Sequence, residues 1–183
     1  QVLVDSRRFV PAHRRRIGLL GQQPLLFPHL DVLGNVAYGP RAQKIRRDEA
    51  RALALEMLEQ LDAADLASRR PDELSGGQAA RVALARALVT KPLAMLIDEP
   101  FAAVDVEYTP RLRVAVKAAL TEVGCPCVIV THDPTDVAAL ADDVAVLESG
   151  RIVEHGPVAE VMARPESSFG KLLFDRDRPE QSS

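Results

Sequence analysis

The chain has 183 residues, of which 47% are apolar and 27% are charged, and this length and composition suit a single folded domain with its own core. The formal net charge is 23 − 26 = −3, and 4% of the residues are aromatic with no Trp. This balance argues against a nucleic-acid-binding protein, which usually carries excess positive charge and aromatic rings for base stacking. No apolar run is long enough to span a bilayer, so a role at a membrane would require a partner.

The first half of the chain predicts two short strands followed by helices. Residues 2–4 and 17–20 are short apolar runs, and the second ends at a Gly-Gln-Gln-Pro sequence. Asp31 can cap a helix that starts at the next residue, because its side chain can accept a hydrogen bond from a free backbone N–H. Apolar residues recurring at helical spacing predict helices over 32–38, 48–61 and 78–89.

The second half predicts strands that alternate with helices. Continuous apolar runs occupy residues 93–97, 128–130 and 144–147, and helical patterns lie near 112–120 and 135–140. This alternation predicts an α/β fold with a parallel sheet covered on both faces. In such sheets, ligands bind at the carboxyl ends of the strands.

Two cysteines, Cys125 and Cys127, flank Pro126. A single C-x-C sequence without a second pair of ligands is a poor zinc site. We therefore expect two small buried thiols at the start of a strand.

The sequence Leu-Ser-Gly-Gly-Gln at residues 74–78 is the most informative stretch. Two glycines allow close approach of a ligand to the backbone, and a following helix directs free N–H groups and the positive end of its dipole at an anion. Ser75 adds a hydroxyl, so the segment can bind phosphate. An isolated Ser-Gly-Gly would more simply be a helix cap. With the sequence of residues 81–88 after it, the segment resembles the signature motif and following helix of the ABC ATPase family.

Further motifs of that family follow in the same order. Residues 95–100 resemble the Walker B strand, which implies that Asp98 holds Mg²⁺ and that Glu99 is the general base for the attacking water. Adjacent carboxylates at a strand end face different directions, so the two can serve the metal and the water separately. Residues 103–105 resemble the D-loop that ends at Asp105, with Val104 where Leu is more usual.

Two more positions complete the set. Residues 130–133 resemble the switch-histidine segment, which implies that His132 contacts the γ-phosphate, although a lone histidine here would more often be structural. Gln22 resembles the glutamine of the Q-loop, and Gln23 is the alternative if the register is shifted by one. The resemblance thus implies catalytic roles for Glu99 and His132, nucleotide contacts by Gln22, Ser75, Gly76, Gly77, Gln78, Asp98 and Asp105, and metal binding by Asp98 and Gln22.

The family resemblance also implies an architecture. It is a P-loop NTPase (RecA-like) core with a parallel sheet and an inserted α-helical subdomain. We expect the core in residues 1–24 and 91–175, the helical signature subdomain in 25–90, and a disordered tail in 176–183.

The lysine-containing phosphate loop of the family, G-x-x-x-x-G-K-[ST], does not occur in the 183 residues. The single Gly-Lys pair, Gly170-Lys171, is followed by Leu172 and has Pro165 where the first glycine would fall. We therefore expect an amino-terminally truncated ATPase domain that is inactive in isolation, because the missing loop grips the β- and γ-phosphates.

Three classes fit these motifs: a transporter ATPase, a soluble ABC ATPase without a transport role, and a non-catalytic pairing module. One motif set without long coiled coils favours the transporter. Residues 27–32 resemble the region of importer ATPases that docks on transmembrane subunits, and the pattern is closest to importers of anions such as molybdate, with sulfate, polyamine, sugar and thiamine importers as alternatives. The resemblance implies ATP and Mg²⁺ as cofactors, transmembrane permease subunits and a second, head-to-tail ATPase subunit as partners, an indirect substrate-binding protein, no nucleic acid, and a cytoplasmic location on the inner face of the cell membrane.

Overall fold

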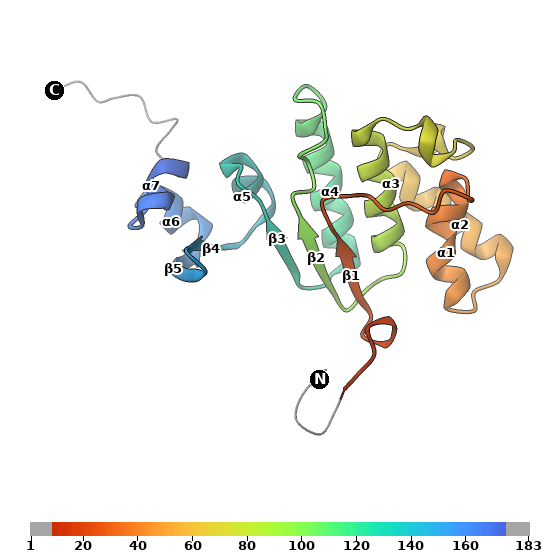
Figure 1. Cartoon of the computed structure of the whole chain (residues 1–183), viewed down its shortest axis with the longest axis horizontal. Helices are drawn as coiled ribbons and strands as arrows, with labels where there is room; N and C mark the ends of the chain where they lie inside the picture. Colours follow the sequence, from red (N-terminus) through yellow and green to blue (C-terminus); the bar gives the residue numbers. More distant parts are fainter. Residues whose placement is uncertain (1–8, 175–183) are drawn as a thin grey trace. The chain divides into compact units, whose positions relative to one another are not determined.

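The computed structural model describes residues 9–174, whose contacts form two compact units, one up to Val130 and one from Thr131. The first unit contains a parallel three-stranded sheet in the order β1-β2-β3 (Figure 1). All three strands were predicted from their apolar runs. Their bounds are β1 Ile17–Leu20, β2 Ala94–Asp98 and β3 Cys127–Val130, and a short 3-10 helix, Ala12–Arg14, precedes β1.

Four α-helices belong to the first unit. Helices α1, α2 and α3 pack against one another, and α3 also contacts β1 and α4 (Figure 1). The predicted cap of α1 is confirmed, because the Asp31 carboxylate accepts a hydrogen bond of 2.6 Å from the N–H of Gly34. The bounds are α1 Val32–Ala42, α2 Arg47–Gln60, α3 Gly76–Leu88 and α4 Thr109–Val123, with 3-10 helices at Ala64–Leu66 and Pro71–Glu73.

The core of the first unit lies between the helices and one face of the sheet. Its side chains come from the apolar stripes of the helices and from alternate positions of β2. Burying a large aliphatic side chain contributes about 1.5–3 kcal/mol, so this set is a main source of stability. The largest fully buried side chains include Leu58, Leu61, Leu66, Leu88, Met95 and Ile97.

The opposite face of the sheet is exposed. Leu19, Leu96 and Val128 lie side by side in the register of the three strands, and their exposed fractions are 70%, 41% and 61%. The prediction that both faces would be covered is therefore wrong for the described residues. Strand β2 alternates between buried and exposed side chains, and β3 alternates between half-buried and exposed ones, although both come from continuous apolar runs.

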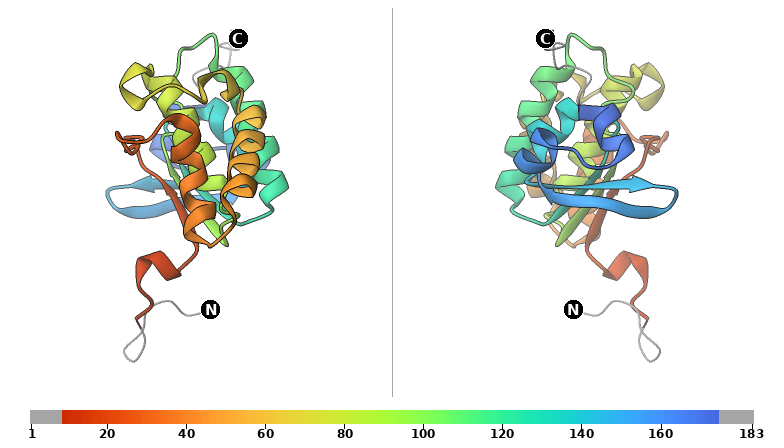
Figure 2. Two further views of the ribbon diagram at one scale, coloured as in Figure 1. Left: turned by 90° about the vertical axis from the view of Figure 1, so that its right-hand side faces the viewer. Right: turned by 90° about the vertical axis from the view of Figure 1, so that its left-hand side faces the viewer.

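The second unit contains an antiparallel hairpin with three helices (Figure 2). The run at 144–147 is a strand, as predicted, but in the described structure it pairs with β5 and not with the parallel sheet. Ser149 and Gly150 both have positive φ, 49° and 76°, and such a two-residue turn reverses the chain into a hairpin. The bounds are α5 Pro134–Leu140, β4 Asp143–Glu148, β5 Arg151–Pro157, α6 Val158–Ala163 and α7 Ser168–Phe174.

The second unit has a small core of its own. Its buried side chains are Val137, Val146, Val161 and Phe174. The Glu154 carboxylate fixes the start of α7, because it accepts hydrogen bonds from the Ser167 hydroxyl (2.6 Å) and from the backbone N–H groups of Glu166 and Ser167. These bonds favour the ionised carboxylate and lower the pKa of Glu154.

The predicted domain boundaries remain predictions. The contacts divide the chain after Val130, which lies inside the range 91–175 that the sequence assigns to one core. The predicted strand at 2–4 and the predicted tail at 176–183 lie outside the described residues.

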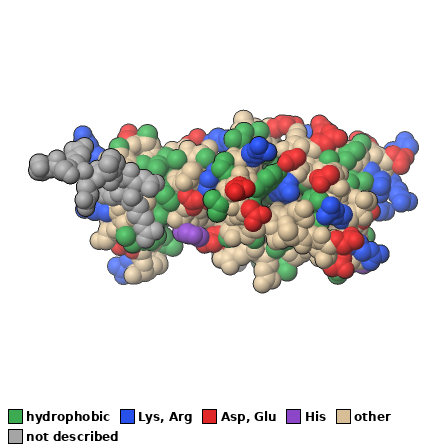
Figure 3. Space-filling view, turned by 90° about the horizontal axis from the view of Figure 1, so that it is seen from above, with side chains coloured by type: hydrophobic (Ala, Val, Ile, Leu, Met, Phe, Trp, Pro, Cys, Tyr) green, Lys and Arg blue, Asp and Glu red, His purple; other side chains and the backbone are tan. Residues whose placement is uncertain are grey.

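Within residues 9–174, no helix combines the length and the apolar character required to cross a membrane. On the face drawn in Figure 3, acidic and basic side chains are interspersed with hydrophobic ones.

Candidate functional site

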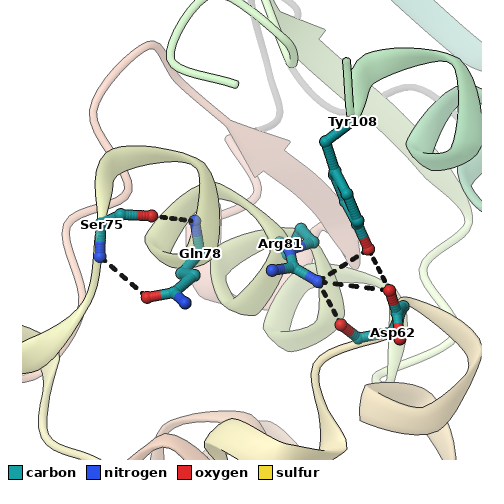
Figure 4. A network of polar contacts seen from close by, with 5 residues as sticks. All are labelled: Asp62, Ser75, Gln78, Arg81 and Tyr108. Atoms are coloured by element: carbon teal, nitrogen blue, oxygen red, sulfur yellow. Dashed lines mark hydrogen bonds and ion pairs between the residues drawn. The ribbon is translucent and has the colours of Figure 1, made fainter. Parts of the chain in front are cut away.

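The signature loop enters α3 through a reciprocal cap (Figure 4). The Ser75 hydroxyl accepts a hydrogen bond of 3.3 Å from the N–H of Gln78, and the Gln78 side-chain oxygen accepts one of 2.9 Å from the N–H of Ser75. Ser75 is exposed, and its hydroxyl acts as the acceptor in this bond, so its own proton can still donate to a ligand. The helix begins at Gly76, two residues earlier than predicted.

The two glycines of the signature loop lie against the D-loop of the same chain. A Cβ atom at Gly77 would lie 3.3 Å from the carbonyl oxygen of Ala103 and 3.3 Å from Val104 Cα, and one at Gly76 would lie 3.3 Å from Ala103 Cβ. Neither glycine has positive φ. The lack of a side chain at these glycines therefore allows two loops of one chain to pack closely. From the sequence we had expected it to allow a ligand to approach the backbone.

The two carboxylates of the Walker B segment sit at the carboxyl end of β2. Asp98 is the last residue of the strand, and Glu99 follows it with φ of 49°, an uncommon value for a residue with a side chain. The N–H of Glu99 donates to the carbonyl of Val130 at 2.9 Å, so the end of β3 holds this backbone in place. Strained backbone of this kind is common where a side chain must be aimed at a reacting group.

A small pocket beside these residues brings the predicted Q-loop and Walker B segments together. Gln22 and Glu99 both line it, with Ala80 of α3 and Ala103 of the D-loop. Gln22 lines this pocket and Gln23 does not, which favours Gln22 as the functional glutamine. Within the first unit, the segment around Gln22 thus meets residues of α3 and of the Walker B segment that lie more than 50 positions further along the chain.

Arg86 of α3 holds the chain just after Gln22. Its guanidinium donates to the carbonyls of Pro24 and Leu25, each at 3.0 Å, and stacks 5.1 Å from the ring centroid of Phe27. Burial lowers the pKa of Arg86 from its usual value. The helix that starts with the signature loop therefore also anchors the exit of the Q-loop.

The predicted docking segment is itself tied to α1. Phe27 is half-buried, and the centroid of its ring lies 4.6 Å from that of the Tyr38 ring. Asn35, which is fully buried, accepts a hydrogen bond of 2.7 Å from the N–H of Phe27 and donates to the carbonyls of Phe27 and Asp31. This segment is thus fixed in shape before any partner binds.

The D-loop residue Asp105 is exposed, and its backbone is well fixed. Its carbonyl accepts hydrogen bonds from the N–H groups of Tyr108 and Thr109, each at 3.0 Å, and from the Thr109 hydroxyl at 2.9 Å. The carboxylate itself remains accessible for contacts beyond the chain.

His132 belongs to the second unit, two residues after the end of β3, and its side chain is exposed. Thr131 and Asp133 fix the backbone on either side: the Thr131 hydroxyl donates to Asp136 at 2.7 Å, and the Asp133 carboxylate accepts from the N–H of Thr135 at 2.7 Å. The proximity of His132 to Glu99 stays a prediction.

The residues fit a metal that arrives with a nucleotide better than a resident one. Within the described ranges, no group of three or more His, Cys, Asp or Glu side chains could hold a metal ion. Asp98 and Gln22 can supply the one or two protein oxygens that Mg²⁺ usually takes, with phosphate oxygens and water completing its shell.

Sequence reasoning missed four residues that shape the site: Asn35, Arg81, Arg86 and Tyr108. Arg81, Arg86 and Tyr108 act through contacts between segments far apart in the sequence, whereas Asn35 bonds to residues four to eight positions before it. The two arginines lie in the helix that follows the signature motif, but its amphipathic pattern does not say which segments their side chains reach.

Comparison with known proteins identifies the family of the chain. A family model described as ABC transporter matches residues 1–102, which is more than half of the chain. The molybdenum import ATP-binding protein ModC of Mycobacterium tuberculosis is 48% identical over 94% of this chain and 48% of its own length. A spermidine/putrescine import ATP-binding protein, PotA of Acidothermus cellulolyticus, is 43% identical, and an Fe(3+) ions import ATP-binding protein, FbpC of Pseudomonas fluorescens, is 44% identical.

Solved structures share the fold. A dimeric ATP-binding cassette in a post-hydrolysis state, bound to ADP and Pi, matches with a TM-score of 0.71 and 33% identity over 80% of this chain and 65% of that one. The protein cbiO1 from Clostridium perfringens, part of the ABC transporter complex cbiONQ, matches with a TM-score of 0.73 and 31% identity over 82% of this chain and 61% of its own.

The chain belongs to the ABC transporter family. Its α/β fold with a parallel sheet is that of the ATP-binding cassettes, as predicted. The chain spans about half the length of the curated relatives it matches.

Proposed function

We propose that this chain is part of the ATP-hydrolysing subunit of an ABC-type importer. The observation that carries the proposal is the pocket in which Gln22 of the Q-loop and Glu99 of the Walker B segment meet Ala103 of the D-loop. The same arrangement of segments would place a metal-bound phosphate and an attacking water between Asp98, Gln22 and Glu99.

Each residue has a role in this proposal. Glu99 takes the proton of the attacking water, and His132 contacts the γ-phosphoryl group as it passes to that water and ADP leaves. Asp98 and Gln22 would hold Mg²⁺, which would neutralise charge on the phosphates. Ser75, Gly76, Gly77 and Gln78 present a helix N-terminus to the γ-phosphate bound by a second copy of the subunit, and Asp105 reaches across the same interface.

The proposed importer function also implies partners for this chain. Relatives with this fold include dimeric cassettes and a component of a transporter complex, which supports a second ATPase subunit and transmembrane permease subunits as partners. Such a subunit lies at the cytoplasmic face of the cell membrane and receives its substrate signal indirectly, from a substrate-binding protein. Residues 1–183 alone should bind ATP weakly and turn it over negligibly, because they contain no lysine-containing phosphate loop.

For the transported substrate we propose a small anion, with molybdate first. The relatives named for molybdenum import stand at 48% identity, against 43% and 44% for those named for polyamine and ferric-ion import. These sequence identities differ little, as expected if other subunits of the transporter select the substrate. Labelled molybdate uptake should be lost when the gene is deleted, and retained molybdate uptake together with lost ferric-ion or spermidine uptake would overturn this assignment.

The enzymatic proposal is tested with Glu99→Gln in the protein at its full natural length. The amide keeps the shape of the carboxylate but cannot take a proton, and loss of a positioned base typically lowers the rate about 10²–10⁴-fold. ATP binding should persist, so the variant should accumulate as an ATP-bound dimer on size exclusion. Glu56→Gln, at an exposed position of α2, is the matched control and should keep wild-type turnover. Unchanged turnover in Glu99→Gln would show that Glu99 is not the base.

A further inference from the structure

Arg81, Tyr108 and Asp62 form a polar cluster outside the pocket (Figure 4). Arg81 Nη1 donates to the Tyr108 hydroxyl at 2.9 Å and to the backbone carbonyl of Asp62, and it lies 3.8 Å from the Asp62 carboxylate. The Tyr108 hydroxyl in turn donates to that carboxylate. The guanidinium also stacks 4.6 Å from the centroid of the Tyr108 ring.

The three residues come from three separate segments. Arg81 lies on α3, Tyr108 is the residue before α4, and Asp62 follows α2. Burial, the hydrogen bond to Asp62 and the charge of that carboxylate raise the pKa of Tyr108, so its hydroxyl stays protonated and can donate. One guanidinium nitrogen, Nη1 of Arg81, therefore engages both other segments.

This cluster lies about one helical turn along α3 from the place where the signature loop contacts the D-loop. Arg81 is four residues after Gly77 and so lies on the same face of α3. Tyr108 is three residues after Asp105 and donates its N–H to the Asp105 carbonyl. The loops thus touch directly at Gly77 and Val104, and they are joined a second time, one turn further on, by Arg81 and Tyr108.

The exposed fractions of the Asp62 and Arg81 side chains indicate that the cluster positions loops more than it stabilises the fold. The Asp62 side chain is 77% exposed, so water can replace its bonds and its ion pair with Arg81 contributes little to folding. The Arg81 side chain is 12% exposed, and its direction is fixed by the ring that it stacks on. What the cluster determines is the relative position of two loops.

We propose that Arg81 and Tyr108 are positioning residues that hold Asp105 in a fixed place relative to Ser75, Gly76 and Gly77. The signature loop, with any phosphate that it binds, and the carboxylate of Asp105 then move as one body when two subunits close. This inference rests on the proposed ATPase function, because it concerns the geometry of the same site.

The test uses the full-length protein with four changes: Tyr108→Phe, Arg81→Lys, the double variant, and Tyr38→Phe as control. Tyr108→Phe keeps the stacked ring and removes only the hydroxyl. Tyr38 is the other tyrosine of the chain and lies exposed on α1, so its change removes a hydroxyl without touching the cluster. Steady-state kcat, KM for ATP and Tm are measured for each protein.

A displaced loop should lower kcat about tenfold in each single variant, with KM for ATP within twofold of wild type and Tm within about 2 °C. The double variant should be no slower than the slower single variant, because both changes break the same link. Tyr38→Phe should match wild type.

Three results would overturn the inference: a kcat of Tyr108→Phe within twofold of wild type, losses that multiply in the double variant, or a fall in Tm together with a rise in KM, which marks a merely structural role. Absence of ATP turnover in the wild type would instead overturn the proposed function itself, and this inference with it.

Discussion

Gly77 of the signature loop lies so close to Val104 of the D-loop that a Cβ atom at Gly77 would be 3.3 Å from Val104 Cα. Both partners are backbone, so neither can move aside as the end of a flexible side chain can. The two loops that would face a partner subunit are therefore packed against each other in one chain.

Gly77→Ala should lower ATP turnover while leaving the thermal stability of the protein nearly unchanged. Alanine gains about 0.5–1 kcal/mol over glycine in a helix, and this gain offsets the cost of a tight contact, so Tm should change by no more than about 2 °C. The D-loop must shift by a few tenths of an ångström, and we expect ATP turnover of the full-length protein to fall about tenfold. Gly156→Ala, whose Cβ would meet Val161 at an ordinary 3.5 Å, is the control. Wild-type turnover in Gly77→Ala would contradict the packing argument.

The signature loop and the helix after it could be predicted because their information is local. Ser75 and Gln78 have the spacing of a capping box, and the structure forms both bonds. The hairpin of the second unit could also have been predicted, because Ser149-Gly150 between two apolar runs is a turn signal. The apolar run before it was assigned to the parallel sheet because periodicity does not specify a pairing partner.

The connections between loops could not be predicted. Arg81 and Tyr108 are 27 residues apart, and no periodic pattern relates them. The same holds for Arg86, which reaches carbonyls about 60 residues earlier. Such contacts depend on how α3 packs in three dimensions, so they follow from tertiary structure and not from any short motif.

Asn35→Ala should destabilise the first unit. Asn35 is fully buried, and its removal leaves the N–H of Phe27 and nearby carbonyls without their partner. Each unsatisfied buried group costs about 1–3 kcal/mol, so the free energy of unfolding should fall by about 2–4 kcal/mol in urea titrations. Gln43→Ala removes an exposed amide that donates to Thr90 at 3.2 Å, and it should cost less than about 0.5 kcal/mol. Equal effects of the two changes would show that the Asn35 bonds add nothing.

Cys127 should react slowly with alkylating reagents. Burial, with a smaller contribution from Cys125, raises the pKa of the Cys127 thiol to about 11. The thiolate fraction at neutral pH falls about a hundredfold for such a shift, while the higher basicity makes the thiolate about tenfold more nucleophilic. In a Cys125→Ala background, iodoacetamide should therefore modify folded Cys127 about tenfold more slowly than the same protein in urea, with a rate that still rises as pH increases above 9. Equal rates in the two states would show that the thiol is not held in this environment.

The neighbouring glutamines Gln22 and Gln23 offer the sharpest test of the pocket. Both side chains are exposed, but Gln22 lines the pocket with Glu99, and Gln23 does not. Gln22→Ala removes the amide that would orient the metal and the attacking water, and loss of such a positioning group should lower kcat of the full-length ATPase about 10–100-fold. Gln23→Ala makes the same chemical change one residue away and should leave kcat within twofold. Both variants should keep the wild-type Tm, because neither side chain is buried.

If Gln23→Ala proved to be the damaging change, the register of the Q-loop would be shifted by one residue. If both variants kept wild-type turnover, the pocket between Gln22 and Glu99 would not be where ATP is hydrolysed.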